Sequence, residues 1–241
     1  MAAYALAVYR LYGESGPQHR KTMVHVLDLL GCVARGATTE AAIEATPEAI
    51  REYLRFLRRH CEPGAPDPRT AFETSIAVHV IEGARLGEGD PDGGFAPDFE
   101  PLTRAEHAMY VRRLRWMQDD LVASLRGLPD AELRAKPDAG RPLVQILGHL
   151  GGAQYGYLQS PLSKPAGLAA AVRLVEDGPD PVDAFEACTA LARTRLDAIT
   201  DAELSAQNRH GVKVWTARRA LRRMLEHQWE HLVEVRARVG V

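Results

Sequence analysis

Cysteine is scarce in this sequence. Only Cys32, Cys61 and Cys188 occur, and no CxxC pair is present. An odd number of widely spaced cysteines does not build a disulfide framework, so we expect reduced thiols and a cytoplasmic protein. The first residues lack the basic start and apolar run of a signal peptide. No apolar stretch approaches the ~20 residues that a membrane helix requires, so no membrane partner is expected.

A strong net charge is also missing. The formal net charge is −2, so no field of the whole chain attracts nucleic acid or an anionic membrane. Nucleic acid is therefore an unexpected partner. The composition, with 46% hydrophobic and 26% charged residues, is typical of a globular protein. A length of 241 residues allows one large domain or two ordinary ones.

The first part of the chain, residues 1–82, predicts an α+β domain. Short β-patterned runs bounded by turn residues predict strands, and one amphipathic stretch predicts a helix. The order β-β-β-α-β favours a small antiparallel sheet with a helix on one face. The strands are expected at 4–9, 22–26, 32–35 and 75–81, and the helix from Thr38 or Thr39 to about His60.

Within that helix, Thr46-Pro47-Glu48 predicts a kink or a restart, because proline fits a first helical turn and Thr46 could cap it. Residues 83–101 then change character. Glycine, proline and acidic residues crowd this stretch, which predicts a linker between two domains.

The remaining part, residues 102–241, predicts an all-α domain. Thr103 is the expected cap of its first helix. Four main helices with one long crossover suit a four-helix bundle. They are expected at about 103–126, 142–158, 182–199 and 216–239, with a short helix near 166–175 in the crossover.

Histidines carry the strongest chemical signal of this part. His227 and His231 are four residues apart in the last helix, so both imidazoles lie on one face and can grip one metal ion. Surface histidines at this spacing are common without a metal, and Gln228 rules out the HExxH pattern of a metalloprotease. His149, in an otherwise apolar helix, is either a core histidine or a third ligand that meets the pair across the bundle.

Three neutral imidazoles predict a divalent metal site with an open coordination position. Zinc is favoured over nickel. Gly148, Gly151 and Gly152 either allow close helix packing or leave room for a ligand. We place Gln145, Glu226 and Glu230 beside the site, outside the metal ligands; Gln145 is equally well explained as a buried structural amide.

Residues 102–241 resemble the DinB/YfiT-like superfamily of metal-binding four-helix bundles. The resemblance rests on His149 late in the second helix, on His227-x-x-x-His231 in the last, and on the lead-in Trp215-Thr216-Ala217-Arg218-Arg219-Ala220-Leu221-Arg222-Arg223. It implies that these three histidines are the metal ligands. Members of that superfamily include thiol-dependent transferases and isomerases, which implies a low-molecular-weight thiol as cosubstrate.

Residues 1–82 resemble the HicB-like domain. The resemblance rests on Val24-His25-Val26-Leu27-Asp28-Leu29-Leu30-Gly31-Cys32-Val33-Ala34-Arg35-Gly36-Ala37-Thr38-Thr39-Glu40-Ala41-Ala42 and on Glu48-Ala49-Ile50-Arg51-Glu52-Tyr53-Leu54. It implies a protein partner, since such domains bind a small RNase toxin. No helix-turn-helix segment accompanies it here.

Two hypotheses follow from these patterns. The first is a metal-dependent enzyme, a thiol-dependent transferase or a hydrolase, acting on a small molecule; no general base is identified. The second is a non-enzymatic, antitoxin-like protein that binds metal and holds a protein partner through the HicB-like domain. A homodimer is expected.

Overall fold

The computed structural model describes residues 6–90, 94–163 and 165–240. The chain forms two compact units. The first contains the described residues up to Asp98 together with Gly211–Lys213, and the second contains Phe99–His210 and the described residues from Val214 onward.

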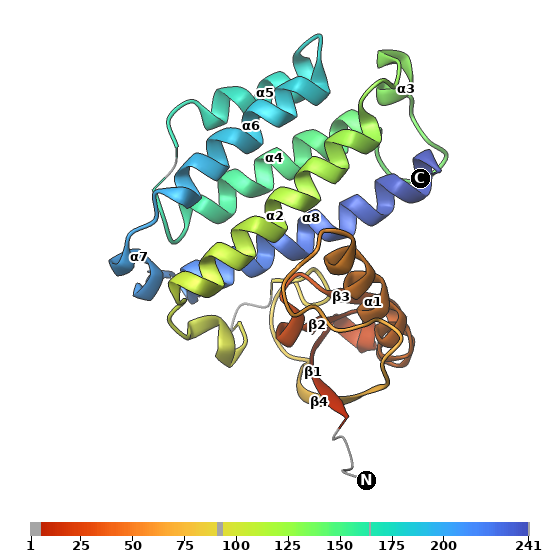
Figure 1. Cartoon of the computed structure of the whole chain (residues 1–241), viewed down its shortest axis with the longest axis vertical. Helices are drawn as coiled ribbons and strands as arrows, with labels where there is room; N and C mark the ends of the chain where they lie inside the picture. The colour runs from red at the N-terminus through yellow and green to blue at the C-terminus, as the bar shows by residue number, and fades with distance from the viewer. Residues whose placement is uncertain (1–5, 91–93, 164, 241) are drawn as a thin grey trace. The chain divides into compact units, whose positions relative to one another are not determined.

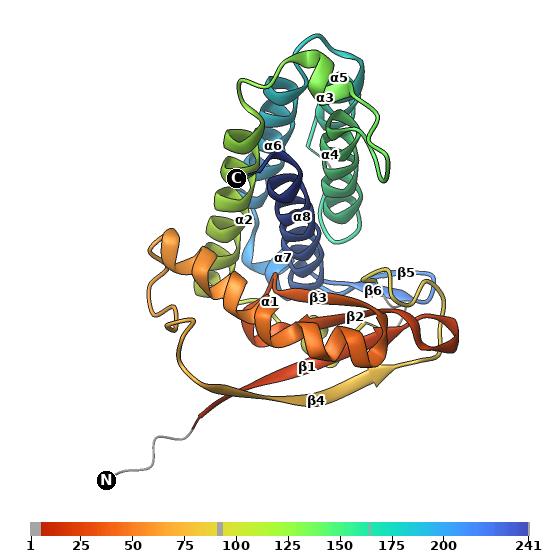
Figure 2. The ribbon, with the colours of Figure 1, turned by 90° about the vertical axis from the view of Figure 1, so that its right-hand side faces the viewer.

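The first unit is a four-stranded sheet with one long helix (Figures 1 and 2). The strands lie in the order β3-β2-β1-β4, and α1 packs on β3 and β2. The elements are β1 (Ala7–Ser15), β2 (Arg20–Val26), β3 (Val33–Thr38), α1 (Thr39–Arg59) and β4 (Phe72–Val80), with short 3-10 turns at Pro17–His19, Leu27–Leu29 and Ala96–Phe99.

The sheet is mixed, so the expected antiparallel sheet is wrong in one pairing. β1 pairs with β2, and β2 with β3, in antiparallel fashion, but β4 runs parallel to β1. The connection explains this difference. A helix between β3 and β4 carries the chain back to the end where β3 began, and such a crossover produces parallel strands.

Helix α1 is continuous through Pro47, so the expected restart does not occur. Thr46 does not cap a new helix, because its hydroxyl donates to the carbonyl of Ala42 at 2.8 Å. Thr38 is the cap, as expected, and accepts a hydrogen bond from the amide of Ala41. The residues expected to face inward are buried: Ile50, Tyr53, Leu54 and Leu57.

The expected linker, residues 83–101, is largely part of the first unit. Leu86, Phe95 and Asp98 are buried in it. The Phe95 ring lies 5.4 Å from the ring of Tyr12 and 5.1 Å from that of His25, centroid to centroid. Glycine and proline content alone therefore overstated the freedom of this segment, because Phe95 packs against two rings of the sheet.

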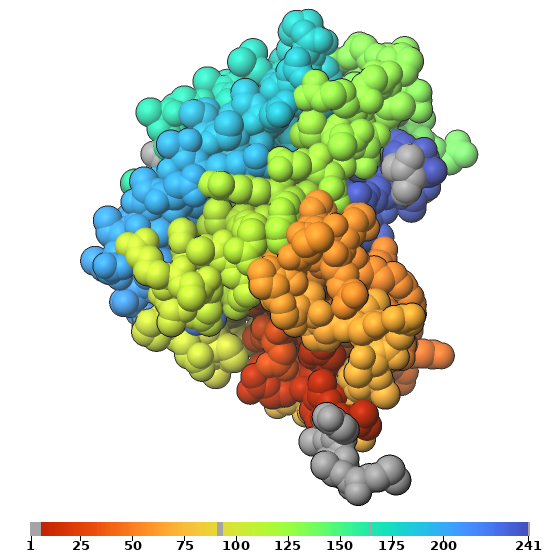
Figure 3. Space-filling view, in the orientation of Figure 1, coloured from red at the N-terminus to blue at the C-terminus, as the bar shows by residue number. Residues whose placement is uncertain are grey.

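The second unit is helical apart from one short hairpin. Four long helices contact one another pairwise, α2 with α8 and α6, and α4 with α6 and α8. Their side chains fill the gaps between the ribbons on the face shown in Figure 3. The elements are α2 (Arg104–Leu125), α3 (Asp130–Arg134), α4 (Leu143–Gln159), α5 (Leu168–Asp177), α6 (Pro181–Asp197), α7 (Asp201–Ser205), β5 (Asn208–His210), β6 (Lys213–Trp215) and α8 (Ala217–Val239).

Caps and apolar stripes account for the long helices. Thr103 and Glu106 form a capping box at the start of α2, and Thr216 accepts a hydrogen bond from the Arg219 amide at the start of α8.

The β5–β6 hairpin was not expected from the sequence. Among the described residues, none of the helices has both the length and the apolar character needed to cross a membrane.

Candidate metal centre

Helix α8 carries two histidines at the edge of its buried face. His227 and His231 are one turn apart and half-buried, and their ring centroids are 4.9 Å apart. The helix buries Leu225, Leu232 and Val235 against its neighbours. Because each residue advances by about 100° around a helix, the histidines fall at the border between this buried face and solvent.

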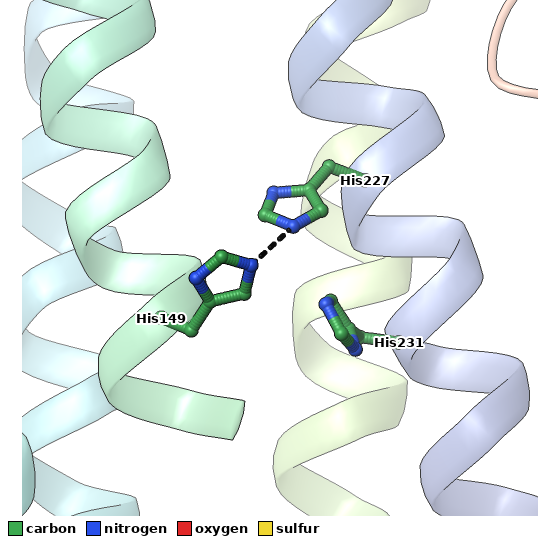
Figure 4. A group of neighbouring side chains, drawn as sticks. All are labelled: His149, His227 and His231. Atoms are coloured by element: carbon green, nitrogen blue, oxygen red, sulfur yellow. Dashed lines mark hydrogen bonds between the residues drawn. The ribbon is translucent and has the colours of Figure 1, made fainter. Parts of the chain in front are cut away.

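His149 on α4 joins this pair. Its Nε2 lies 2.9 Å from Nε2 of His227, and its ring centroid lies 5.4 Å from that of His231. Figure 4 shows the three rings converging from the two facing helices. Of the two explanations open for His149, its placement matches the third ligand, because the side chain is exposed at the seam and not enclosed in the core.

The donor set fits a first-row divalent ion. One nitrogen from each ring lies within 4.8 Å of the other two. Bonds of about 2.0–2.1 Å to a tetrahedral zinc hold nitrogen donors about 3.4 Å apart, so small side-chain rotations suffice. Imidazole suits zinc and nickel alike. Solvent reaches the exposed ring of His149, so the site is accessible to a further ligand.

Glu234 orients the third histidine. Nδ1 of His231 lies 2.7 Å from Oε2 of Glu234, and a carboxylate can only accept there, so Nδ1 carries the proton. The lone pair of Nε2 is then left for a metal, as in carboxylate–histidine–metal arrangements. Sequence reasoning missed this residue. Its position three residues after His231, one turn along the helix, was the available signal.

Local electrostatics keep His149 neutral. Desolvation of the imidazole, then the positive charge of Arg141 and the nearby His231, lower the pKa of His149 to about 4, against a smaller opposing effect of Glu234. The ring is therefore unprotonated at neutral pH. A neutral imidazole is the form that binds metal, so little proton competition is expected at this ligand.

The three residues expected beside the site differ in their surroundings. Glu226 is buried, and its Oε2 accepts hydrogen bonds from Arg222 at 2.9 Å and Arg223 at 2.8 Å. Glu230 is half-buried, and its charge helps to raise the pKa of Arg223. Gln145 is exposed one turn before His149, which excludes the buried structural amide.

The glycines of α4 divide between the two roles considered for them. A Cβ on Gly148 would lie 2.2 Å from Oε1 of Glu176, and one on Gly151 would lie 3.2 Å from Sγ of Cys188. These two glycines therefore allow close packing against α5 and α6. Gly152 has no neighbouring atom within 4 Å of such a Cβ, so it leaves open space on the side of His149.

A family model of the DinB superfamily matches residues 113–235, just over half of the chain, and this span includes all three histidines. The chain belongs to the DinB superfamily. Members of this superfamily generally bind metal ions. No curated protein and no solved structure matches the chain.

Proposed function

We propose that this DinB-superfamily chain is a metal-dependent enzyme that binds one divalent ion through His149, His227 and His231. Zinc is favoured over nickel. The observation that carries the proposal is the convergence of three imidazole nitrogens from two helices, all within 4.8 Å of one another. Near neutral pH, such an ion supplies Lewis acidity that lowers the pKa of a bound thiol or water.

The proposed reaction is attack of a low-molecular-weight thiol on a small electrophilic molecule: a bond to sulfur forms, the bond to the leaving group breaks, and the leaving group takes up the proton that the thiol loses. Hydrolysis of that molecule is the variant in which water replaces the thiol. Four side chains have a role in this reaction. The three histidines hold the ion, and Glu234 fixes the tautomer of His231. Exposure of His149 and the open space at Gly152 support access of a small substrate to this side.

Metal content tests the site. Purified protein should contain about one divalent ion per chain, because three imidazole nitrogens converge on one point. Changing all three histidines to alanine should remove it, as measured by elemental analysis. Full metal occupancy in the triple variant would refute the assignment, provided circular dichroism shows that the variant is folded.

The open coordination position tests the chemistry. In cobalt-substituted protein, a low-molecular-weight thiol should produce sulfur-to-cobalt charge-transfer absorption as it binds and loses its proton. His149→Ala should weaken or abolish the band. A cobalt spectrum that no added thiol or anion perturbs would indicate a closed, structural site and would exclude the enzyme proposal.

A second candidate function is favoured by the edge of the sheet in the first unit. β4 is an edge strand with no buried residue, and Ile76 and Val78 on it are 60% and 37% exposed. Exposed strand edges accept a further strand from another chain. In this alternative the HicB-like part binds a protein partner, such as a small RNase, or a second copy of the chain in the proposed homodimer. Tight complex formation without thiol-dependent turnover would favour it.

A further inference from the structure

The carboxylate that orients His231 is itself held in place. Glu234 accepts from His231 through Oε2, and its other oxygen, Oε1, accepts from Nη2 of Arg238. These three residues are spaced i, i+3 and i+7 along α8, so their side chains follow one face of the helix. Arg238 therefore limits the positions that the Glu234 carboxylate can take.

Arg238 also reaches the helix that carries His149. Its second amino group, Nη1, donates to the carbonyl oxygen of Arg141 at 2.6 Å. Arg141 stands directly before Pro142, the cap of α4. One guanidinium thus joins the orienting carboxylate on α8 to the start of α4.

Gly140 makes room for this contact. Its φ of +88° lies in the region that favours glycine, and a Cβ there would lie only 2.4 Å from Nη2 of Arg238. Both the backbone turn and the approach of the guanidinium therefore depend on the missing side chain. The loop before α4 is shaped to receive Arg238.

We propose that Arg238 is a positioning residue of the metal centre, linking His231, through Glu234, to the α4 segment that leads to His149. This inference rests on the proposed metal site. The ligands come from two helices, so affinity depends on the helices being held at the correct separation. A guanidinium suits this part, because its planar fork donates to two acceptors in a fixed geometry.

Metal affinity measured by competition with a chromophoric chelator tests this link. Zinc affinity should fall about 10-fold in Arg238→Ala and in Glu234→Gln, the scale typical for losing a group that orients a ligand. Arg238→Lys should recover only part of the loss, because one ammonium cannot reproduce the fork. Gly140→Ala should weaken binding in the same direction.

Arg236→Ala is the matched control. Arg236 lies on the same last turns of α8 and pairs with Asp120 of α2 at 2.8 Å, so its ion pair joins α8 to α2 and not to the start of α4. The zinc affinity of Arg236→Ala should stay within about twofold of the wild-type value, although this variant loses an ion pair just as Arg238→Ala does. Equal affinities for Arg238→Ala and Arg236→Ala would overturn the proposal.

The tautomer of His231 gives a second readout that needs no metal. Long-range ¹H–¹⁵N correlation spectra of the metal-free protein should show the proton on Nδ1. Glu234→Gln and Arg238→Ala should shift the ring towards a mixture of tautomers, whereas Arg236→Ala should not. If wild-type protein binds no metal, the proposed function fails, and an unchanged tautomer in Arg238→Ala would separately refute the positioning role.

Discussion

Two glutamates on α8 have different roles because they lie on different faces of the helix. Glu226 points into the unit and accepts from two buried arginines, whereas Glu234 lies at the border with solvent and accepts from His231. Glu226 and Glu234 are only about two helical turns apart, yet they differ in burial and in hydrogen-bond partners. The residue type alone therefore does not say which glutamate serves the metal centre.

Glu226→Gln is expected to destabilise the helical unit strongly. The substitution removes the negative charge that two buried guanidiniums, those of Arg222 and Arg223, share. Loss of one partner from a buried ion pair typically costs about 3–5 kcal/mol in the free energy of unfolding. Urea unfolding followed by tryptophan fluorescence measures it, since Trp116, Trp215 and Trp229 all lie in the helical unit.

The control for this substitution is Glu186→Gln. Glu186 pairs with Arg126 on the surface at 2.6 Å, and both side chains are more than half exposed. Such pairs contribute about 0–1 kcal/mol, so little change is expected. A loss for Glu226→Gln no larger than that for Glu186→Gln would show that the buried cluster does not stabilise the fold.

At the scale of elements, α4 shows how one helix serves packing and site at once. Gly148 and Gly151 allow α5 and α6 to approach closely, while His149 between them points to the seam with α8. Gly152, one turn after His149, meets nothing. The periodicity of the helix separates these functions onto different faces.

Gly152→Ala should therefore stabilise the helical unit more than Gly148→Ala does. At position 152 the methyl group has open space, and alanine is favoured over glycine in a helix by about 1 kcal/mol. At position 148 the methyl group would lie 2.2–2.7 Å from three atoms of the exposed Glu176 side chain, so that side chain must move and part of the same gain is lost. Paired denaturant titrations compare the two free energies of unfolding; a gain at position 148 equal to or larger than that at position 152 would contradict the packing assignment.

At the scale of the whole molecule, the chain divides into two compact units with their own buried side chains. The division falls at Asp98 and Phe99, within the stretch where a linker was expected, but Leu86 and Phe95 of that stretch are buried in the first unit. Gly211–Lys213, at the tip of the hairpin before α8, belong to the first unit, although the residues on both sides of them in the sequence belong to the second. Its Val212 is 77% exposed.

A fragment from Phe99 to Val241 should fold on its own and keep the candidate metal centre, because it contains the four long helices of the second unit and His149, His227 and His231. The expected results are a helical circular dichroism spectrum, cooperative thermal unfolding and about one divalent ion per fragment. The full chain serves as the comparison for both measurements. Non-cooperative melting of the fragment would show that the first unit is required for the helical unit to fold.

The sequence by itself determined the order of the sheet strands and of the long helices, and it named the three candidate metal ligands. Local periodicity, caps such as Thr103 and the HxxxH spacing act over a few residues, so they can be read without a fold. His149 needed a further inference, that a polar ring in an apolar helix meets the pair on the last helix.

Tertiary structure alone decided the parallel pairing of β4, the packing of Phe95 on the sheet and the continuity of α1 through Pro47. It also decided that Glu226 is enclosed with arginines and that Glu234 and Arg238 support His231. These outcomes depend on which side chains from distant segments share a neighbourhood. Burial and pairing of that kind are properties of the packed chain, and no local pattern of residues specifies them.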